Sequence, residues 1–247
     1  MSRHTQGSFA AAVALHERLL RQPDPHAVSA ALQPDRLATP TQWTPDLLPL
    51  RPYESVDPAS LGLAGHDDFH VIPDAVLDAA IARVVDTEGP VHFDVLADRL
   101  LEGAGVGRLG SRIRARIEAR LEAMVADIPG TGVPIDWHQG FVARPTQHLK
   151  PAYRDWREAP DKTRQLEYVS DEELMLALFR AVLDADCGER ESAMNEGIHA
   201  IGFIRLTNNA RTRLETPLEA LLGTGLLVDR GGKLGVTSVL GAHRQCS

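Results

Sequence analysis

Apolar residues between positions 74 and 126 recur at three- and four-residue intervals, which is the spacing of amphipathic helices. They predict helices over residues 74–85, 93–101 and 111–126. Asp74 and Ser111 stand at the start of the first and third of these segments, so we expect both to act as N-caps.

A β-hairpin is predicted directly after the third helix, over residues 134–144, with its turn at His138, Gln139 and Gly140. Residues 1–34 hold two further helical patterns. Seven prolines between positions 34 and 73 predict an extended connector that wraps the core.

The same order of elements is predicted a second time after residue 170. Ser170 and Asp171 would cap a helix over residues 172–183, a second helix covers 191–200, and a third follows the turn at Gly202. A hairpin over 226–237 ends the set. Pro217 interrupts the third helix, so we expect that helix to be kinked, or split with Thr216 capping its last part.

The two sets are diverged copies of one another. Shifting residues 73–127 by 97 positions places them on residues 170–224 without a gap, and identical residues recur, most densely between 105 and 123. The shared glycine and arginines of this dense stretch are Gly105/Gly202, Arg108/Arg205, Arg114/Arg211 and Arg116/Arg213.

Helix, helix, glycine turn, basic helix and hairpin is the order of a winged helix-turn-helix. We therefore expect a mainly α fold with small β-hairpins, built as tandem winged helix-turn-helix repeats. The expected parts are the N-terminal helices and connector (1–72), a first winged-helix unit (73–145), a basic linker (146–169), a second winged-helix unit (170–238) and a tail (239–247).

The charge is unevenly distributed along the chain. The sequence carries 26 Lys and Arg against 34 Asp and Glu, a net charge of −8. Each copy begins acidic and turns basic in its second half, a segregation that favours docking of a polyanion on the basic half. The alternative is that acidic and basic helices pair inside each copy.

The third helix of the first copy carries the main candidates for nucleic-acid contact. Arg112, Arg116 and Arg120 lie four residues apart and share one face, and no acidic residue on the same helix is placed to neutralise them. Acidic residues elsewhere in the fold are the alternative partners. The full candidate set for nucleic-acid binding is Arg108, Arg112, Arg114, Arg116, Arg120, His138, Arg144, Lys150, Arg205, Arg211 and Arg213.

Basic residues also alternate with Tyr153 and Trp156 in the linker. Such a segment can hold a single strand by stacking and charge. The favoured interpretation is an inter-domain linker whose aromatic residues anchor on the core.

The sequence holds no recognisable catalytic, metal or nucleotide motif. His66 and His70 flank two aspartates but lack the spacing of a known metal site, and no P-loop lysine follows the glycines at 103–107. We expect no enzyme activity, no cofactor and no bound metal. No apolar run is long enough for a membrane span, and the two cysteines, which form no C-x-x-C pair, favour a cytoplasmic protein.

Over about residues 73–237 the chain resembles a domain of unknown function found at the C-terminus of bacterial superfamily-I helicase proteins, often beside a Vsr-like endonuclease domain in phage-defence loci. The resembling segments are residues 90–92, 96–100, 105–114, Ile117 and Leu121, and then 172–182, 201–206, Arg211, Leu214, Leu218 and Leu221. The resemblance implies an accessory role beside a helicase or nuclease and supplies no catalytic residues. This sequence lacks both enzymatic domains, so we expect it to act alone, to act with partners in trans, or to be an excised segment of a larger protein.

The leading hypothesis is a non-catalytic protein that binds nucleic acid, with DNA favoured, as an accessory of a helicase, nuclease or phage-defence system. The rival hypothesis is an acidic winged-helix scaffold that docks on a protein partner. Exposed and coplanar arginine faces in the two copies would favour the first hypothesis, whereas arginines buried against the acidic segment 172–196 would favour the second.

Overall fold

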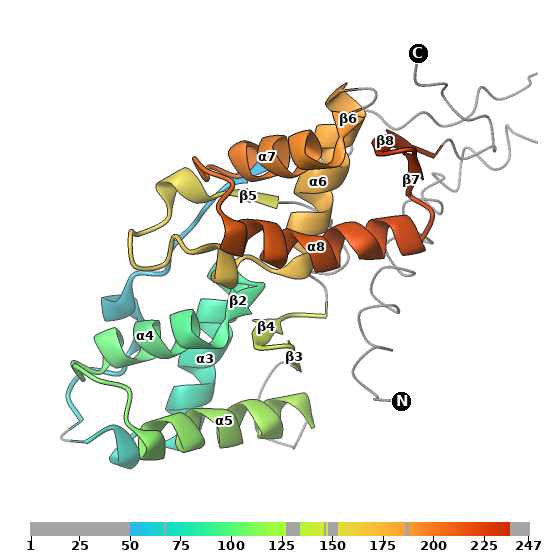
Figure 1. Cartoon of the computed structure of the whole chain (residues 1–247). Helices are drawn as coiled ribbons and strands as arrows, with labels where there is room; N and C mark the ends of the chain where they lie inside the picture. The colour runs from blue at the N-terminus through green and yellow to red at the C-terminus, as the bar shows by residue number, and fades with distance from the viewer. Residues whose placement is uncertain are drawn as a thin grey trace, which may run out of the picture. The chain divides into compact units, whose positions relative to one another are not determined.

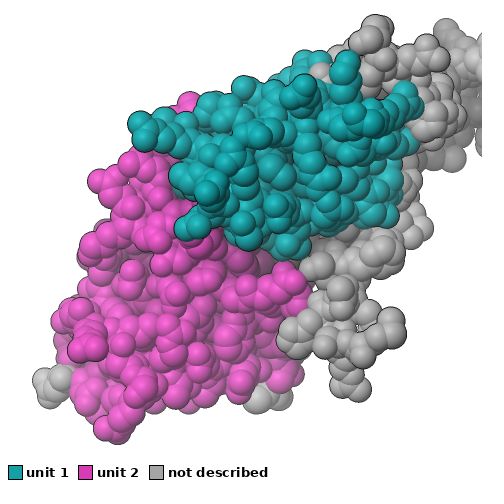
Figure 2. Space-filling view, in the orientation of Figure 1, with its two compact units in different colours: residues 1–51, 152–154, 171–247 teal, residues 52–151, 155–170 magenta. Residues whose placement is uncertain are grey.

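The computed structural model describes residues 50–66, 68–126, 134–145, 147, 153–185 and 188–237 (Figure 1). The two helices expected in residues 1–34 and the candidate Lys150 lie outside the described residues. The chain divides into two compact units (Figure 2). The first-copy unit, magenta, comprises residues 52–151 and 155–170, and the second-copy unit, teal, comprises 1–51, 152–154 and 171–247.

The first-copy unit is built on three α-helices and a three-stranded antiparallel sheet. The helices are α3 (Asp74–Glu88), α4 (Phe93–Gly103) and α5 (Ser111–Val125), and the strands are β2 (Val91–His92), β3 (Asp136–His138) and β4 (Phe141–Ala143). The sheet has the order β2-β4-β3, so the short strand between the first two helices pairs with the hairpin.

One apolar face from each helix forms the core of this unit. Fully buried side chains such as Leu77, Leu96 and Leu121 belong to a single cluster. Burying a leucine of this kind stabilises the fold by roughly 2 kcal/mol. The connector contributes to the same cluster through two 3-10 helices, η2 (Pro58–Leu61) and η3 (Phe69–Val71), so its described part packs against the helices.

The second-copy unit repeats this arrangement. Its helices are α6 (Asp171–Ala185), α7 (Arg190–Ala200) and α8 (Asn208–Gly223), and its strands are β6 (Gly188–Glu189), β7 (Leu227–Arg230) and β8 (Lys233–Val236). The sheet order is β6-β8-β7. Two further strands, β1 (Leu50–Pro52) and β5 (Tyr153–Asp155), form a separate two-stranded sheet.

The order of the elements follows the repeat in the sequence. Helices α6, α7 and α8 each begin 97 residues after α3, α4 and α5. The expected helices and both hairpins are confirmed for residues 74–237, and the described chain is mainly helical with small sheets. The short strands β2 and β6 were not predicted, because two residues carry no periodicity.

The expected caps of α3 and α5 are wrong. Pro73 and Gly110 occupy the N-cap positions, neither makes a side-chain cap, and Asp74 and Ser111 are the first helical residues. Asp74 is used in ion pairs instead, as described below.

Helix α8 is one continuous helix that contains Pro217, so of the two alternatives, a kink or a split capped by Thr216, the split is wrong. Its N-cap is Thr207, whose hydroxyl oxygen accepts a hydrogen bond from the backbone N–H of Ala210 at 3.2 Å. The first hairpin turn is also shorter than expected. It consists of Gln139 and Gly140, both with positive φ, as a two-residue type I′ turn requires.

Among the described residues, no helix combines the length and the apolar character needed to cross a membrane.

Candidate functional site

The arginines of α5 are largely used within their own unit. Arg116 donates to the Asp74 carboxylate at 3.0 Å and to the carbonyl oxygen of Ile72. Arg120 donates to both oxygens of Asp78, at 2.8 and 2.6 Å, and to Asp74 at 2.9 Å. Arg116 and Arg120 thus have no acidic partner on α5 itself, as expected, and the alternative of acidic partners elsewhere in the fold is confirmed for both, because α3 supplies the carboxylates.

Arg114, on the other flank of α5, bridges to α4. Its guanidinium donates to Asp94 at 2.8 Å and lies 3.8 Å from the Glu118 carboxylate. The same guanidinium stands 4.6 Å from the centre of the Phe93 ring, a cation–π contact.

The second copy keeps both bridges at the same offset. Arg213 pairs with Asp171, and these residues correspond to Arg116 and Asp74 of the first copy. The third helix is thereby tied to the first turn of the first helix in each unit, where the helix dipole also favours negative charge.

The bridge to the second helix recurs in the same way. Arg211 pairs with Glu191, and these residues correspond to Arg114 and Asp94. Both carboxylates again lie in the first turn of their helix. The shared arginines thus fix the third helix against its two neighbours in both copies.

The Arg120–Asp78 pair has no counterpart in the second copy. The offset places Pro217 and Met175 at these positions, and both are buried. In the first copy the Asp78 side chain is only 5% exposed, and its hydrogen bond raises the pKa of Arg120. A buried ion pair in one copy thus corresponds to apolar residues in the other.

Three candidate arginines are left over. Arg108, Arg112 and Arg205 are exposed and have no ion-pair partner among the described residues. Arg108 and Arg205 are equivalent positions in the loop before the third helix. His138 is exposed at the end of β3, whereas Arg144 is buried and pairs with Asp86 at 2.6 Å.

The linker aromatics anchor on the units. Trp156 and Tyr153 are both almost fully buried, and Arg154 between them pairs with the buried carboxylate of Glu173 at 2.6 Å. This arrangement agrees with the favoured interpretation of an anchored linker.

A buried charge cluster of the first-copy unit was missed by the sequence analysis. Glu88 accepts hydrogen bonds from Arg99 at 2.8 Å, from the Tyr53 hydroxyl at 2.7 Å and from the Val56 N–H at 3.0 Å. Arg99 also donates to the Thr163 hydroxyl. The cluster ties distant segments to α3 and α4, and no local spacing signals it.

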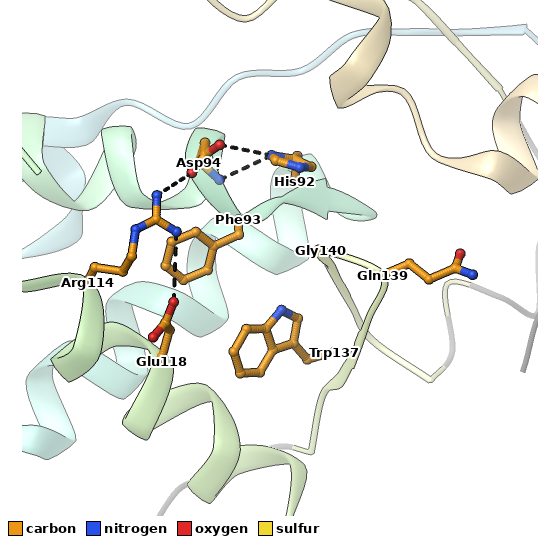
Figure 3. A pocket seen from close by; sticks show the side chains of 8 residues that line it. All are labelled: His92, Phe93, Asp94, Arg114, Glu118, Trp137, Gln139 and Gly140. Carbon is orange, nitrogen blue, oxygen red and sulfur yellow. Dashed lines mark hydrogen bonds and ion pairs between the residues drawn. The ribbon is translucent and has the colours of Figure 1, made fainter. Parts of the chain in front are cut away.

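An aromatic hollow opens where α4, α5 and the first hairpin meet (Figure 3). Its volume is about 340 Å³. Phe93 and Trp137 form the aromatic wall, with ring centres 6.1 Å apart and planes inclined by 23°. Figure 3 shows Arg114 linked to Asp94 and to Glu118 beside the Phe93 ring. The lining residues are His92, Phe93, Asp94, Arg114, Glu118, Trp137, Gln139 and Gly140.

The histidine beside this hollow is held by its surroundings. His92 is the N-cap of α4, and its Nδ1 atom accepts a hydrogen bond from the Asp94 N–H at 3.2 Å. Its ring lies 4.8 Å from that of Tyr168 and meets Phe141 edge-on at 5.2 Å. The side chain of His92 at the edge of the hollow is therefore held in place by a hydrogen bond and by ring packing.

A second, more polar hollow lies on the second-copy unit, with a volume of about 580 Å³. It is lined by α7, α8 and the loop between them, and includes Arg205 and Ile204. Ile204 is 84% exposed, which is unusual for a large apolar side chain.

The described residues contain no group of three His, Cys, Asp or Glu placed to hold a metal ion. Within the histidine-rich segment of the connector, Asp68 caps η3 by accepting a hydrogen bond from the His70 N–H.

The comparisons with known proteins give one match. Residues 67–115 match a family model described as "Protein of unknown function (DUF3320)". The matched segment contains α3, α4 and the start of α5. It supports the expected resemblance to a domain of unknown function. No curated protein and no solved structure matched.

Proposed function

We propose that this chain is a non-catalytic protein-interaction module made of two winged-helix units. One observation carries the proposal: the arginines that both copies share on the third helix, Arg114/Arg211 and Arg116/Arg213, are paired with carboxylates of their own unit. Their recurrence is explained by the need to fix the third helix, so it is no longer evidence for a polyanion.

The winged-helix assignment is supported by the order of the elements. In each unit a short strand separates the first two helices and pairs with the last strand of the terminal hairpin. This is the order and pairing expected of a winged helix-turn-helix.

Charge favours a protein partner over a nucleic acid. The chain carries −8 overall, and the bridges neutralise much of the positive charge on α5 and α8. A polyphosphate backbone would meet partly exposed carboxylates such as Asp94 and Glu118 beside the remaining arginines.

The partner class follows from the resemblance. The family that the sequence resembles occurs with superfamily-I helicases and nucleases of phage-defence loci, and the match over residues 67–115 falls largely within the first copy. We infer that the partner is a helicase or nuclease, beside which this module has an accessory role.

The experiment is reconstitution of a complex. Purified full chain would capture interacting proteins from a lysate of its native host, and each candidate would then be purified and mixed with it. A stoichiometric complex with a helicase or nuclease, stable in size-exclusion chromatography after nuclease treatment, supports the proposal. A complex that disappears once nucleic acid is digested contradicts it.

Nucleic-acid binding is the second candidate, and the observation that favours it is the trio of Arg108, Arg112 and Arg205. These exposed side chains have no ion-pair partner in the described part of the chain, and Arg108 and Arg205 recur at one position. The contact surface would then be the loop before each third helix, together with the first turn of α5, and would be smaller than the full face first expected.

A further inference from the structure

We propose that the aromatic hollow of the first-copy unit binds a partner-protein segment in which an aromatic side chain is flanked by Lys or Arg. This inference rests on the proposed function, since it names the chemistry of one docking point.

The aromatic wall is specific to the first copy. The 97-residue offset places Arg190 at the position of Phe93, and Arg190 pairs with Glu219. In the first hairpin Trp137 lies two residues before the turn, and Asp229 occupies the same place in the second hairpin. The second copy folds with charged residues at both positions, so the repeated arrangement does not require an aromatic pair there. In the first copy Phe93 belongs to the core cluster, whereas Trp137 packs against that cluster and stays partly exposed.

The shape suits one planar side chain. Phe93 is buried, whereas Trp137 is partly exposed at the edge of the core. Their rings are nearly parallel and line an open hollow of about 340 Å³, which is within the range of small binding pockets. Aromatic side chains seated in such pockets supply much of the binding energy of protein interfaces.

The rim selects positive charge. The side chains of Asp94 and Glu118 are 43% and 38% exposed, and both contact the guanidinium of Arg114. Two carboxylates against one guanidinium leave this group of three with an excess of negative charge. A basic residue beside the aromatic anchor would complete the pairing, whereas a phosphate or an acidic residue would be repelled.

The hollow requires little rearrangement. Arg114 is held by its ion pair with Asp94 and by its contact with the Phe93 ring. His92 is held by the hydrogen bond that it accepts from the Asp94 N–H and by its contact with the Tyr168 ring. A preformed site avoids part of the entropic cost of ordering side chains on binding.

The test titrates the ¹⁵N-labelled full chain with three capped peptides, acetyl-Gly-Arg-Phe-Arg-Gly-amide, its Glu-Phe-Glu analogue and its Arg-Gly-Arg analogue. We expect the first to bind with a Kd of about 0.1–1 mM, to shift the indole N–H of Trp137, and to bind roughly tenfold more tightly than either analogue. Equal binding of the Glu-Phe-Glu peptide, or no binding of the first peptide at about 5 mM, would overturn the inference.

Matched variants locate the site. Trp137→Ala should abolish the shifts of the neighbouring amides and Trp137→Phe should retain them, and a native-like spectrum of each variant establishes that it is folded. Glu118→Gln should weaken binding about threefold, whereas Glu122→Gln, exposed on the same helix and outside the hollow, should leave it unchanged. Undiminished binding by folded Trp137→Ala contradicts the inference.

The reconstituted complex separates this inference from the proposed function. If Trp137→Ala still forms the complex with full affinity, the hollow is not the docking point and the module function stands. If oligothymidylate rather than the peptide shifts Trp137, the hollow binds nucleic acid and both proposals fail.

Discussion

At the residue scale, two arginines on one face of a helix have different roles, because the fold places a carboxylate beside only one of them. Arg112 and Arg120 lie on one helix, yet Arg120 is bound to a buried aspartate and Arg112 is exposed without an ion-pair partner among the described residues. Their spacing along α5 alone predicts the same environment for both side chains. The difference depends on α3, whose Asp74 and Asp78 are distant in the sequence.

Replacing Arg120 by Met should destabilise the first-copy unit by about 3 kcal/mol, because it leaves the buried Asp78 carboxylate without its main partner. Arg112→Met, its control, should change stability by less than about 0.5 kcal/mol. Both described tryptophans, Trp137 and Trp156, lie in this unit, so urea unfolding followed by tryptophan fluorescence measures the effect. Equal losses of unfolding free energy in the two variants would contradict the stabilising role assigned to the Arg120–Asp78 ion pair.

The Asp98 carboxyl gives the unit a pH dependence. Asp98 is exposed at the surface of α4, yet partial desolvation raises its pKa above the ordinary value. The neighbouring Glu102 carboxylate raises it further, against Lys162 and Arg99, which lower it. The folded protein therefore holds this proton more tightly than the unfolded chain, so the contribution is favourable at low pH and is lost as pH rises through the raised pKa.

Asp98→Asn should accordingly be more stable than the unmodified chain at pH 7. The difference should shrink as the pH falls through the raised pKa and should be smallest below about 4, where the carboxyl is protonated in both states. Urea unfolding at a series of pH values measures this, with Glu122→Gln as a control for the loss of one surface charge. An Asp98→Asn variant that is less stable than the unmodified chain at pH 7, or a stability difference that does not change with pH, would contradict the raised pKa of Asp98.

At the element scale, the helices and hairpins followed from periodicity and turn residues, whereas their ends and cross-links did not. Three- and four-residue spacing placed α3, α4 and α5, and the glycines placed both hairpin turns. The caps were misassigned because Asp and Ser are also suited to the first helical turn. The bridges were not predictable, since they join helices whose packing no local pattern specifies.

The N-cap residue Thr207 allows a direct test of where helix α8 begins. Thr207→Ala removes the hydroxyl that accepts from Ala210 and should cost about 1 kcal/mol. Amides in the first turns of α8 should then exchange with solvent roughly fivefold faster when exchange proceeds by opening of that helix. Thr212→Ala, exposed within α8, is the control, and equal exchange rates in the two variants would contradict the cap.

At the scale of the whole molecule, two copies of one arrangement share their internal bridges and differ on their surfaces. The first copy presents an aromatic hollow with a negatively charged rim, and the second presents an exposed Ile204 beside Arg205. The shared bridges of Arg114/Arg211 and Arg116/Arg213 thus report on the fold. The arginine pattern alone predicted nucleic-acid binding, because local spacing does not identify the carboxylates on other helices that pair with these arginines.

We propose that the shared arginines of the third helices serve the fold and that the chain as a whole does not dock on a polyanion. The most direct measurement is fluorescence anisotropy of labelled double- and single-stranded DNA with the full chain across a salt series. The account predicts no binding tighter than about 100 μM at about 100 mM salt, which is the weak limit of non-specific association. Binding at low micromolar concentration that falls steeply with salt and is lost in a folded Arg108→Glu/Arg112→Glu/Arg205→Glu variant would contradict it.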